Sequence, residues 1–345
     1  MAQIKFNNSK TIGDFQDPYV IAELNTSHFG NIEIAKEMIE RSIDAGCNCV
    51  KFQSWSANTL YSEKYFTENK IAKRVFDKFA LTENELKELS IYSRERQVDF
   101  ASTPYSLDEA KFLIEECGVP FIKIASMELN NLPYLEQLGS LNFPLVLSTG
   151  MGTLEEIKSA VKTVKDNGCN SLAVLHCNAT YPADIHEINL NNIITLRSEL
   201  GNVPIGYSDH TIGLAAAVAS VALGACIIEK HFTLDSERIG MDNQMATEPK
   251  EMTEMILACR EAHNALGNHE RKLSKSEFEQ RSKMRRSIIA KHDLNKGDII
   301  TLGSLEYKRP GDGLSPEIAS RLIGRRILSE KISKGDVIRI SDLEN

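Results

Sequence analysis

Two histidines follow two successive strand-like segments, and their spacing could bring both imidazoles to one metal ion. His210 ends the segment VPIGYSDH, and His231 ends the segment ACIIEKH. The stretch between them, IGLAAAVASVALGA, predicts a helix, so the segments form a βαβ unit whose two strands end at the same edge of a sheet. Two imidazoles so placed can bind one divalent metal and leave coordination positions open for a substrate. The alternative interpretation is two unrelated polar residues in loops.

Two lysines within apolar segments indicate an anion-binding site. Lys51 lies in the sequence VKF and Lys123 in the sequence IKI, and both segments predict strands with little access to water. A buried ammonium group requires a neighbouring anion. Together with nearby serine and threonine hydroxyls, the two lysines are suited to a phosphate and a carboxylate. With a metal beside them, the residues suggest metal-assisted carbon–carbon bond formation on a small phosphorylated acid.

Eight strand-like segments, each followed by a helical pattern, determine how these groups would be positioned. The segments are YVIAEL (19–24), NCVKFQ (48–53), VDFAST (98–103), PFIKIA (120–125), PLVLST (144–149), SLAVLHC (171–177), VPIGYS (203–208) and ACIIEK (225–230). Eight βα units within about 250 residues predict a (β/α)8 TIM barrel, whose catalytic groups lie at the carboxyl ends of the strands. An open doubly wound sheet is the alternative, but ELNTSHFGN after the first strand lacks a glycine-rich dinucleotide turn.

The chain divides into a barrel domain at 1–268, a polar linker at 269–284 and a small β-rich domain at 285–345. The phrase KGDII at 296–300 returns as KGDVI at 334–338, which predicts two related turn-and-strand units. The net charge of −8 is uneven, because the C-terminal domain is basic and the barrel is acidic. No series of aromatic residues accompanies the basic residues, so we expect docking onto an acidic surface or an anion, and no nucleic acid.

Composition and cysteine usage indicate a globular protein of the cytoplasm. Hydrophobic residues make up 42% of the 345 residues, and charged residues 26%. No apolar run approaches the ~18 residues of a membrane span, and the first residues do not resemble a signal peptide. The seven cysteines include no CxxC pair, which is typical of free buried thiols in a reducing compartment.

A long segment after the second strand, 54–83, is expected to border the active site.

The chain resembles the sialic acid (nonulosonic acid) synthase family over nearly its full length. The matching motifs are VIAELNTSHFGN, VKFQ, STPYS, KIASMEL, LSTGMG, TYP, GYSDHTIG, EKHFTLD and RPGDGLSP. The C-terminal domain is similar to that family's antifreeze-like (SAF, β-clip) domain. The resemblance implies condensation of phosphoenolpyruvate with an N-acylated hexosamine, either N-acetylmannosamine or a 2,4-diacetamido-2,4,6-trideoxyhexose. The products would be a nine-carbon 2-keto sugar acid and phosphate, released by C–O cleavage.

The resemblance also implies a role for each residue that matches a motif. His210 and His231 would hold a divalent metal, expected to be Mn²⁺, that polarises the sugar aldehyde. Phosphoenolpyruvate would be held by Lys51, Lys123, Ser126 and Ser148. The sugar would be contacted by Gln53, Tyr105, Tyr181 and Arg309, and the reacting centre would be lined by Glu23, Glu128 and Asp242. Because Arg309 would reach the sugar from the partner subunit, a domain-swapped homodimer is expected.

One loop departs from the family pattern. The family usually has Asp-His-(Lys or Ser)-Ala-Ser after the eighth strand, whereas this chain has MDNQMAT at 241–247. Asp242 is retained, but amides follow it, so we expect altered handling of the sugar or altered support of the metal site, with neutral drift as the alternative.

Two other functions stay open. A noncatalytic sugar-binding protein would leave the lysines and histidines without a purpose, and an octulosonate-type synthase would lack the RPGDGLSP domain.

Overall fold

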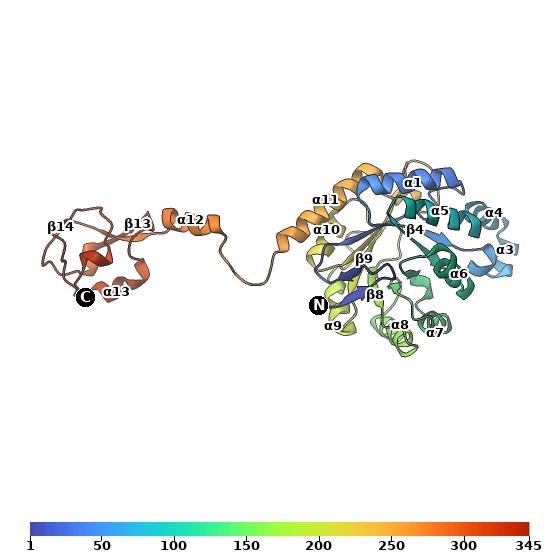
Figure 1. Cartoon of the computed structure of the whole chain (residues 1–345), viewed down its shortest axis with the longest axis horizontal. Helices are drawn as coiled ribbons and strands as arrows, with labels where there is room; N and C mark the ends of the chain where they lie inside the picture. The colour runs from blue at the N-terminus through green and yellow to red at the C-terminus, as the bar shows by residue number, and fades with distance from the viewer. Residues whose placement is uncertain (345) are drawn as a thin grey trace. The chain divides into compact units, whose positions relative to one another are not determined.

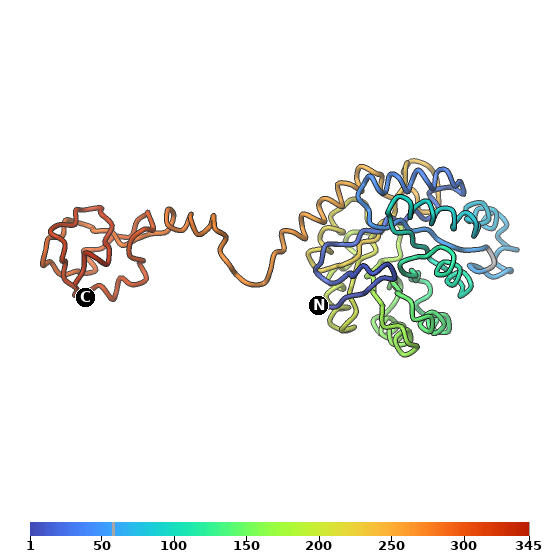
Figure 2. Tube along the Cα trace, in the orientation of Figure 1, coloured from blue at the N-terminus to red at the C-terminus, as the bar shows by residue number. Residues whose placement is uncertain are grey.

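The computed structural model describes residues 1–344, apart from the side chains of residues 57 and 58. The chain forms two compact units, Met1–Gly267 and Asn268–Asn345, which are described separately. In the first unit, an inner set of strands is surrounded by helices (Figure 1). The tube in Figure 2 follows the chain as it alternates between the two layers. Within the described residues, every helix is too short or too polar to cross a bilayer.

The strands of the first unit form the predicted TIM-type barrel. They are β3 (Tyr19–Glu23), β4 (Cys49–Ser54), β5 (Asp99–Pro104), β6 (Ile122–Ile124), β7 (Leu145–Ser148), β8 (Leu172–Cys177), β9 (Ile205–Asp209) and β10 (Ile227–His231). Consecutive strands pair in parallel, and β10 pairs with β3, where His231 lies opposite Glu23. Only the seam between β5 and β6 lacks a ladder among the described strands. The (β/α)8 prediction is confirmed.

The helices of the first unit cover the outside of the barrel. The longer ones are α1 (Ile32–Ala45), α5 (Glu83–Glu95), α7 (Leu132–Ser140), α8 (Leu154–Asp166), α9 (Asn192–Leu200), α10 (Ala215–Ala222) and α11 (Pro249–Leu266), with the shorter α6 (Leu107–Phe112) after β5. The α1 helix begins at Asn31, whose side chain accepts hydrogen bonds from two backbone amides of the first turn. It ends at Gly46, where φ is 92°, a left-handed conformation that favours glycine.

A β-hairpin closes the end of the barrel where the strands begin. Its strands are β1 (Gln3–Lys5) and β2 (Thr11–Gly13), which sequence analysis did not predict. The Phe6 ring packs against Phe121 in a tilted arrangement, with 4.6 Å between the ring centroids, and edge to face against Tyr19 at 5.3 Å. These rings join an apolar cluster made of the inward-facing residues of the strands. A site within the barrel is therefore accessible from the carboxyl end of the strands, as the sequence predicts.

The segment after β4 forms three short helices. They are α2 (Ala57–Leu60), α3 (Glu63–Glu68) and α4 (Lys70–Phe79). An aromatic cluster holds them together: the Tyr61 and Phe76 rings are 5.3 Å apart, and the Trp55 and Phe76 rings are 6.2 Å apart. The excursion at 54–83 is therefore a packed element with its own apolar core.

The second unit has a small core of its own. The helix α12 (Lys275–Met284) lies in the predicted linker and is followed by β11 (Ser287–Ala290), β12 (Leu294–Asn295), β13 (Leu305–Lys308), α13 (Ala319–Leu322) and β14 (Lys331–Ile332). The strands pair in antiparallel fashion, β11 with β13 and β12 with β14. The two KGD phrases form equivalent turns, because Gly297 and Gly335 have φ of 90° and 91°. The last isoleucine of each phrase, Ile300 and Ile338, is fully buried.

Candidate active site

All eight strands of the barrel contribute to one cavity at their carboxyl ends. Its volume is about 380 Å³. The strand residues that line it are Glu23, Lys51, Gln53, Thr103, Lys123, Ser148, Cys177, Ser208, Glu229 and His231. For seven of these ten side chains, the residue two positions earlier, such as Ile21 or Cys49, belongs to the apolar cluster inside the barrel. The period-two alternation of the strands therefore places the polar groups directly above that cluster.

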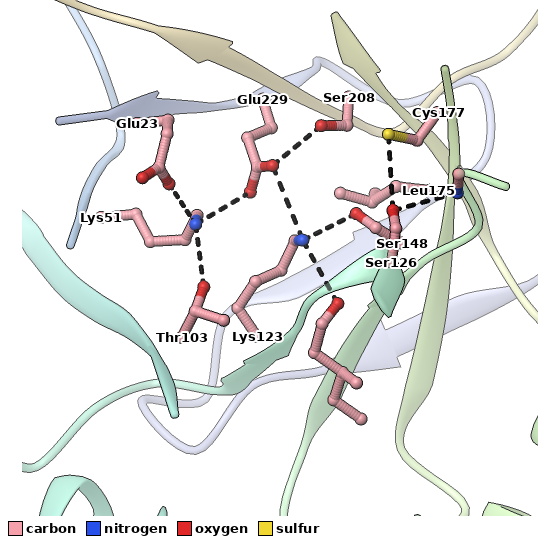
Figure 3. A network of polar contacts seen from close by, with 12 residues as sticks. Glu23, Lys51, Thr103, Lys123, Ser126, Ser148, Leu175, Cys177, Ser208 and Glu229 are labelled. Carbon is pink, nitrogen blue, oxygen red and sulfur yellow. Dashed lines mark hydrogen bonds and ion pairs between the residues drawn. The ribbon is translucent and has the colours of Figure 1, made fainter. Parts of the chain in front are cut away.

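Buried charged side chains from several strands form a network of polar contacts (Figure 3), and they line the cavity. The Lys51 ammonium group forms an ion pair with Glu23 and donates a hydrogen bond to the Thr103 hydroxyl at 3.0 Å. The Lys123 ammonium group donates to the Ser148 hydroxyl at 2.6 Å. Both lysines are about 3% exposed, so water contributes little to their stabilisation. Their remaining charge compensation comes from one residue that sequence analysis did not name.

That residue is Glu229, on strand β10. Its Oε1 lies 3.6 Å from Lys123 Nζ, and its Oε2 lies 3.7 Å from Lys51 Nζ. The Ser208 hydroxyl donates a hydrogen bond to the same carboxylate at 2.8 Å. Strand alternation could have revealed it, because Glu229 lies two residues before His231 and therefore faces the same side.

Burial and neighbouring charges set the protonation of this network. Burial alone would raise the pKa of Glu229, but Lys123, Lys51 and the Ser208 hydroxyl lower it to about 2. Burial raises the pKa of Glu23 although Lys51 opposes this. Burial also lowers the pKa of Lys123, against the attraction of Glu229. Glu229 is thus the carboxylate whose ionised form the site favours.

The two predicted metal ligands lie together at the carboxyl ends of β9 and β10. The His210 and His231 ring centroids are 5.3 Å apart, and the Asn178 carbonyl lies 2.7 Å from His210 Nδ1. Burial and the neighbouring His210 hold the pKa of His231 well below its usual value, which favours a neutral imidazole able to bind metal. The described residues contain no set of three or more histidine, cysteine or acidic side chains arranged to hold a metal. The pair fits a metal with most positions open to substrate or water.

Asp242 lies beside the histidine pair. The Asn25 side-chain amide donates to its carboxylate at 2.6 Å, and burial raises its pKa. Asn243, the first residue of the departure from the family pattern, is 1% exposed and holds the loop. Its amide donates to the carbonyls of Asp235 and Arg238, and its oxygen accepts from the Thr233 hydroxyl at 2.6 Å. The side chain that replaces the family's histidine is therefore engaged in supporting the loop.

Three of the four residues predicted to contact the sugar, Gln53, Tyr105 and Tyr181, line the cavity. The Tyr105 hydroxyl donates to the Gln53 side-chain oxygen at 3.1 Å. The Tyr181 ring lies 4.3 Å from the His210 ring, with about half of its surface exposed. Ser126 also lines the cavity and accepts a hydrogen bond from the Gly150 amide at 3.0 Å. The predicted segment 54–83 reaches the same cavity.

One predicted residue of the first unit is not brought into the cavity. Glu128 lies outside its lining and accepts a hydrogen bond from the Asn131 side chain at 2.7 Å. Arg309 belongs to the second unit, where it is exposed in a closely packed loop. A Cβ at Gly313 would lie 2.0 Å from the Val337 side chain, so the loop requires glycine there.

The fold and the cavity define a (β/α)8-barrel protein with a lysine and carboxylate network facing a histidine pair, followed by a small β domain. Comparison with known proteins agrees with the resemblance found in the motifs. The NeuB family matches residues 38–271, and the SAF domain matches residues 285–344. The chain therefore belongs to the NeuB family.

Several relatives match along nearly the whole chain. The N,N'-diacetyllegionaminic acid synthase of Legionella pneumophila is 35% identical, covering 99% of this chain and 98% of that protein. The N-acetylneuraminate-9-phosphate synthase of Homo sapiens is 31% identical, covering 92% and 90% respectively. The crystal structure of a sialic acid synthetase from Leptospira borgpetersenii, in complex with citrate, is 33% identical with a TM-score of 0.74, covering 81% of this chain and 94% of that one. These similarities support a nonulosonic acid synthase.

Proposed function

We propose that this protein condenses phosphoenolpyruvate with an N-acylated hexosamine, forming a nine-carbon 2-keto sugar acid and phosphate. The observation that carries the proposal is the cavity itself, in which two buried lysines with free hydrogen-bonding capacity face two neighbouring imidazoles. An anionic phosphorylated acid suits the first group, and a carbonyl brought to a metal suits the second. The names of the relatives support the same reaction class.

The lysine side of the cavity would hold phosphoenolpyruvate. Lys51 and Lys123 would offset the charge of its carboxylate and phosphate, and the hydroxyls of Ser126 and Ser148 would donate hydrogen bonds to their oxygens. These donors lie on β4, on β6 and the turn that follows it, and on β7, so they can surround a small anion. The arrangement would place C3 of the enol towards the histidines.

His210 and His231 would hold the divalent metal, which we propose is Mn²⁺, because imidazole ligands suit it better than Mg²⁺. When bound there, the metal would supply Lewis-acid polarisation of the sugar aldehyde. Gln53, Tyr105 and Tyr181 would orient the open-chain sugar by hydrogen bonding from the cavity mouth.

The proposed reaction forms a carbon–carbon bond, consumes water and releases phosphate. C3 of phosphoenolpyruvate forms a bond with the aldehyde carbon, and the aldehyde oxygen takes up a proton and becomes a hydroxyl. Water adds to the cationic C2 and gives up a proton. The resulting C2 hydroxyl loses its second proton as the C2–O bond to phosphate breaks, which releases phosphate and leaves the 2-keto acid. Glu23 and Asp242, with pKa values raised by burial, are placed to move protons at this centre. The role of Glu128 stays a prediction from the family resemblance.

The cavity wall favours a sugar without a phosphate group. Among the described residues, Lys51 and Lys123 are the lysine or arginine side chains of the lining, and both face carboxylates. The segment 54–83 contributes an apolar wall made of Trp55, Leu60, Tyr61 and Phe76. Such a wall suits the methyl groups of acylamino substituents and of a 6-deoxy carbon. We therefore propose a neutral N-acyl hexosamine as the acceptor.

We further propose a domain-swapped homodimer in the cytoplasm. In such a dimer, Arg309 of one subunit would reach the sugar in the other. The closely packed loop that carries Arg309 supports this role, because a rigid loop can present one side chain at a fixed position.

Phosphate release tests the proposed reaction. The protein would be incubated with phosphoenolpyruvate, Mn²⁺ and separately with N-acetylmannosamine, its 6-phosphate, a 2,4-diacetamido-2,4,6-trideoxyhexose and arabinose 5-phosphate. We expect phosphate release with a neutral N-acyl hexosamine, and none after chelation of the metal. Release with arabinose 5-phosphate alone would indicate the octulosonate-type reaction. If sugars of the panel bind but none of them leads to phosphate release, the noncatalytic alternative would be supported.

A further inference from the structure

We propose that Glu229 is a positioning residue for phosphoenolpyruvate, which keeps Lys51 and Lys123 charged and in place without using the hydrogen bonds that they offer to the substrate. This inference rests on the proposed function. It concerns a carboxylate that is itself buried, about 5% exposed, and that faces both lysines at once (Figure 3).

The distances between Glu229 and the two lysines allow attraction between their charges but are too long for direct hydrogen bonds. The two lysine nitrogens lie 3.6 and 3.7 Å from the Glu229 oxygens, beyond the 2.7–3.2 Å that is usual for a direct hydrogen bond. Charge attraction persists at that separation, particularly away from water. Glu229 Oε2 has no hydrogen-bond partner among the described residues. The carboxylate therefore compensates the ammonium groups while leaving N–H groups available.

Lys123 depends on Glu229 more than Lys51 does. Lys51 also pairs with Glu23, whereas Glu229 supplies the one ion pair of Lys123 among the described residues. The other partners of Lys123 are neutral oxygens, the Ser148 hydroxyl and the Ile124 carbonyl. Without Glu229, two buried ammonium groups would share the single carboxylate of Glu23. Their mutual repulsion would then favour deprotonation or displacement of Lys123.

The position of the carboxylate is itself fixed. The Ser208 hydroxyl donates to Glu229 Oε1 from the neighbouring strand β9. In the sheet, Ser208 lies directly opposite Glu229. A carboxylate held by a neutral hydroxyl and the strand backbone can keep its place when the substrate enters between the lysines.

The variant Glu229→Gln tests the inference, because it keeps the size of the side chain and an acceptor for Ser208 while removing the charge. Binding of phosphoenolpyruvate would be measured by calorimetry without sugar, and KM values by phosphate release. We expect the Kd and KM for phosphoenolpyruvate to rise roughly tenfold to a hundredfold, with the KM for the sugar changed less than about threefold. Glu229→Asp, which restores the charge, should recover part of the affinity.

A double-variant cycle provides a second measurement, and Ser208→Ala alone still tests the placement of the carboxylate if Glu229→Gln folds poorly. Ser208→Ala should weaken phosphoenolpyruvate binding less than Glu229→Gln does, and the double variant should match Glu229→Gln alone if Ser208 acts through the carboxylate. Additive effects would assign Ser208 a separate contact and would contradict the fixed placement. As a control, Glu199→Gln removes the same charge from an exposed ion pair with Lys158 and should change neither constant.

Two outcomes would overturn the inference while leaving the proposed function intact. Unchanged or tighter phosphoenolpyruvate binding by Glu229→Gln would mean that the carboxylate competes with the substrate. A higher KM for the sugar, with phosphoenolpyruvate affinity retained, would assign Glu229 to the histidine side of the cavity. Failure of the unsubstituted protein to bind phosphoenolpyruvate would instead overturn both the proposed function and this inference.

Discussion

Two buried ion clusters lie on opposite faces of the same strands, and only one of them faces a cavity. On the outer face, under the helices, Lys230 Nζ donates to Asp209 at 2.7 Å and to the Thr211 carbonyl at 2.8 Å. The second Asp209 oxygen accepts from the Thr211 amide and hydroxyl. On the inner face, Glu229 lies at 3.6–3.7 Å from two lysines. In the outer cluster the lysine is within hydrogen-bonding distance of the carboxylate, whereas Glu229 is farther than that from both inner lysines.

The difference separates a structural ion pair from a binding site. Both oxygens of Asp209 have hydrogen-bond donors, so neither carboxylate oxygen of the outer cluster is left without a partner. In the inner network, Glu229 Oε2 lacks a hydrogen-bond partner among the described residues. A buried acceptor beside a cavity can be satisfied by a donor that water or a ligand brings. Burial and charge alone would not have distinguished the two clusters.

The largest effect should come from the inner face, at a metal ligand. We expect His231→Ala to lower kcat/KM by roughly 10⁴-fold, which corresponds to about 5.5 kcal/mol of transition-state stabilisation. Calorimetry should show weakened Mn²⁺ binding, while the free energy of unfolding changes little. The exposed His186 provides a control, and His186→Ala should retain metal binding and activity. Full metal affinity in His231→Ala would contradict the assignment of this histidine.

The outer cluster should determine stability instead. Lys230→Met leaves the buried Asp209 charge without its lysine, so we expect the free energy of unfolding to fall by about 3–5 kcal/mol. Urea unfolding followed by the fluorescence of Trp55, the single tryptophan, reports on the barrel. Adding Asp209→Asn should recover much of the loss, because no unpaired charge then remains. A loss below about 1 kcal/mol for Lys230→Met would remove the contrast between the clusters.

An equivalent lysine change on the inner face should separate activity from stability. We expect Lys123→Met to lower kcat/KM by roughly 10²–10³-fold, since it removes a donor to the substrate. The free energy of unfolding should fall by less than about 1 kcal/mol, because Glu229 keeps Lys51 and Ser208 as partners. A stability loss as large as that of Lys230→Met would show that both clusters are structural.

The smallest effect should come from Arg309, which belongs to the second unit. We expect Arg309→Ala to raise the KM for the sugar about tenfold, near 1.4 kcal/mol, with little change in the KM for phosphoenolpyruvate. Mixing Arg309→Ala with His231→Ala, under conditions where subunits exchange, should restore some activity in the mixed dimer. Activity that does not return despite demonstrated exchange would contradict the domain-swapped arrangement.

The sequence by itself determined the architecture and which charged and imidazole side chains meet in the cavity. Strand periodicity and the helical patterns between the strands predicted the barrel, and Lys51, Lys123, His210 and His231 could be assigned to the ends of their strands. The repeated KGD phrase predicted equivalent turns in the second unit. These predictions succeed because side-chain alternation along a strand is local, and because parallel strands of a barrel share one end.

Only the tertiary structure decided which charges are satisfied. Glu229 and Lys230 are adjacent residues of one strand, yet Lys230 finds a saturating partner in Asp209, and Glu229 faces two lysines from distant strands. The buried role of Asn243 in its loop and the place of Glu128 outside the cavity were likewise not evident from the motifs. The physical reason is that hydrogen-bond distances between strands depend on how the barrel closes, which no local pattern records.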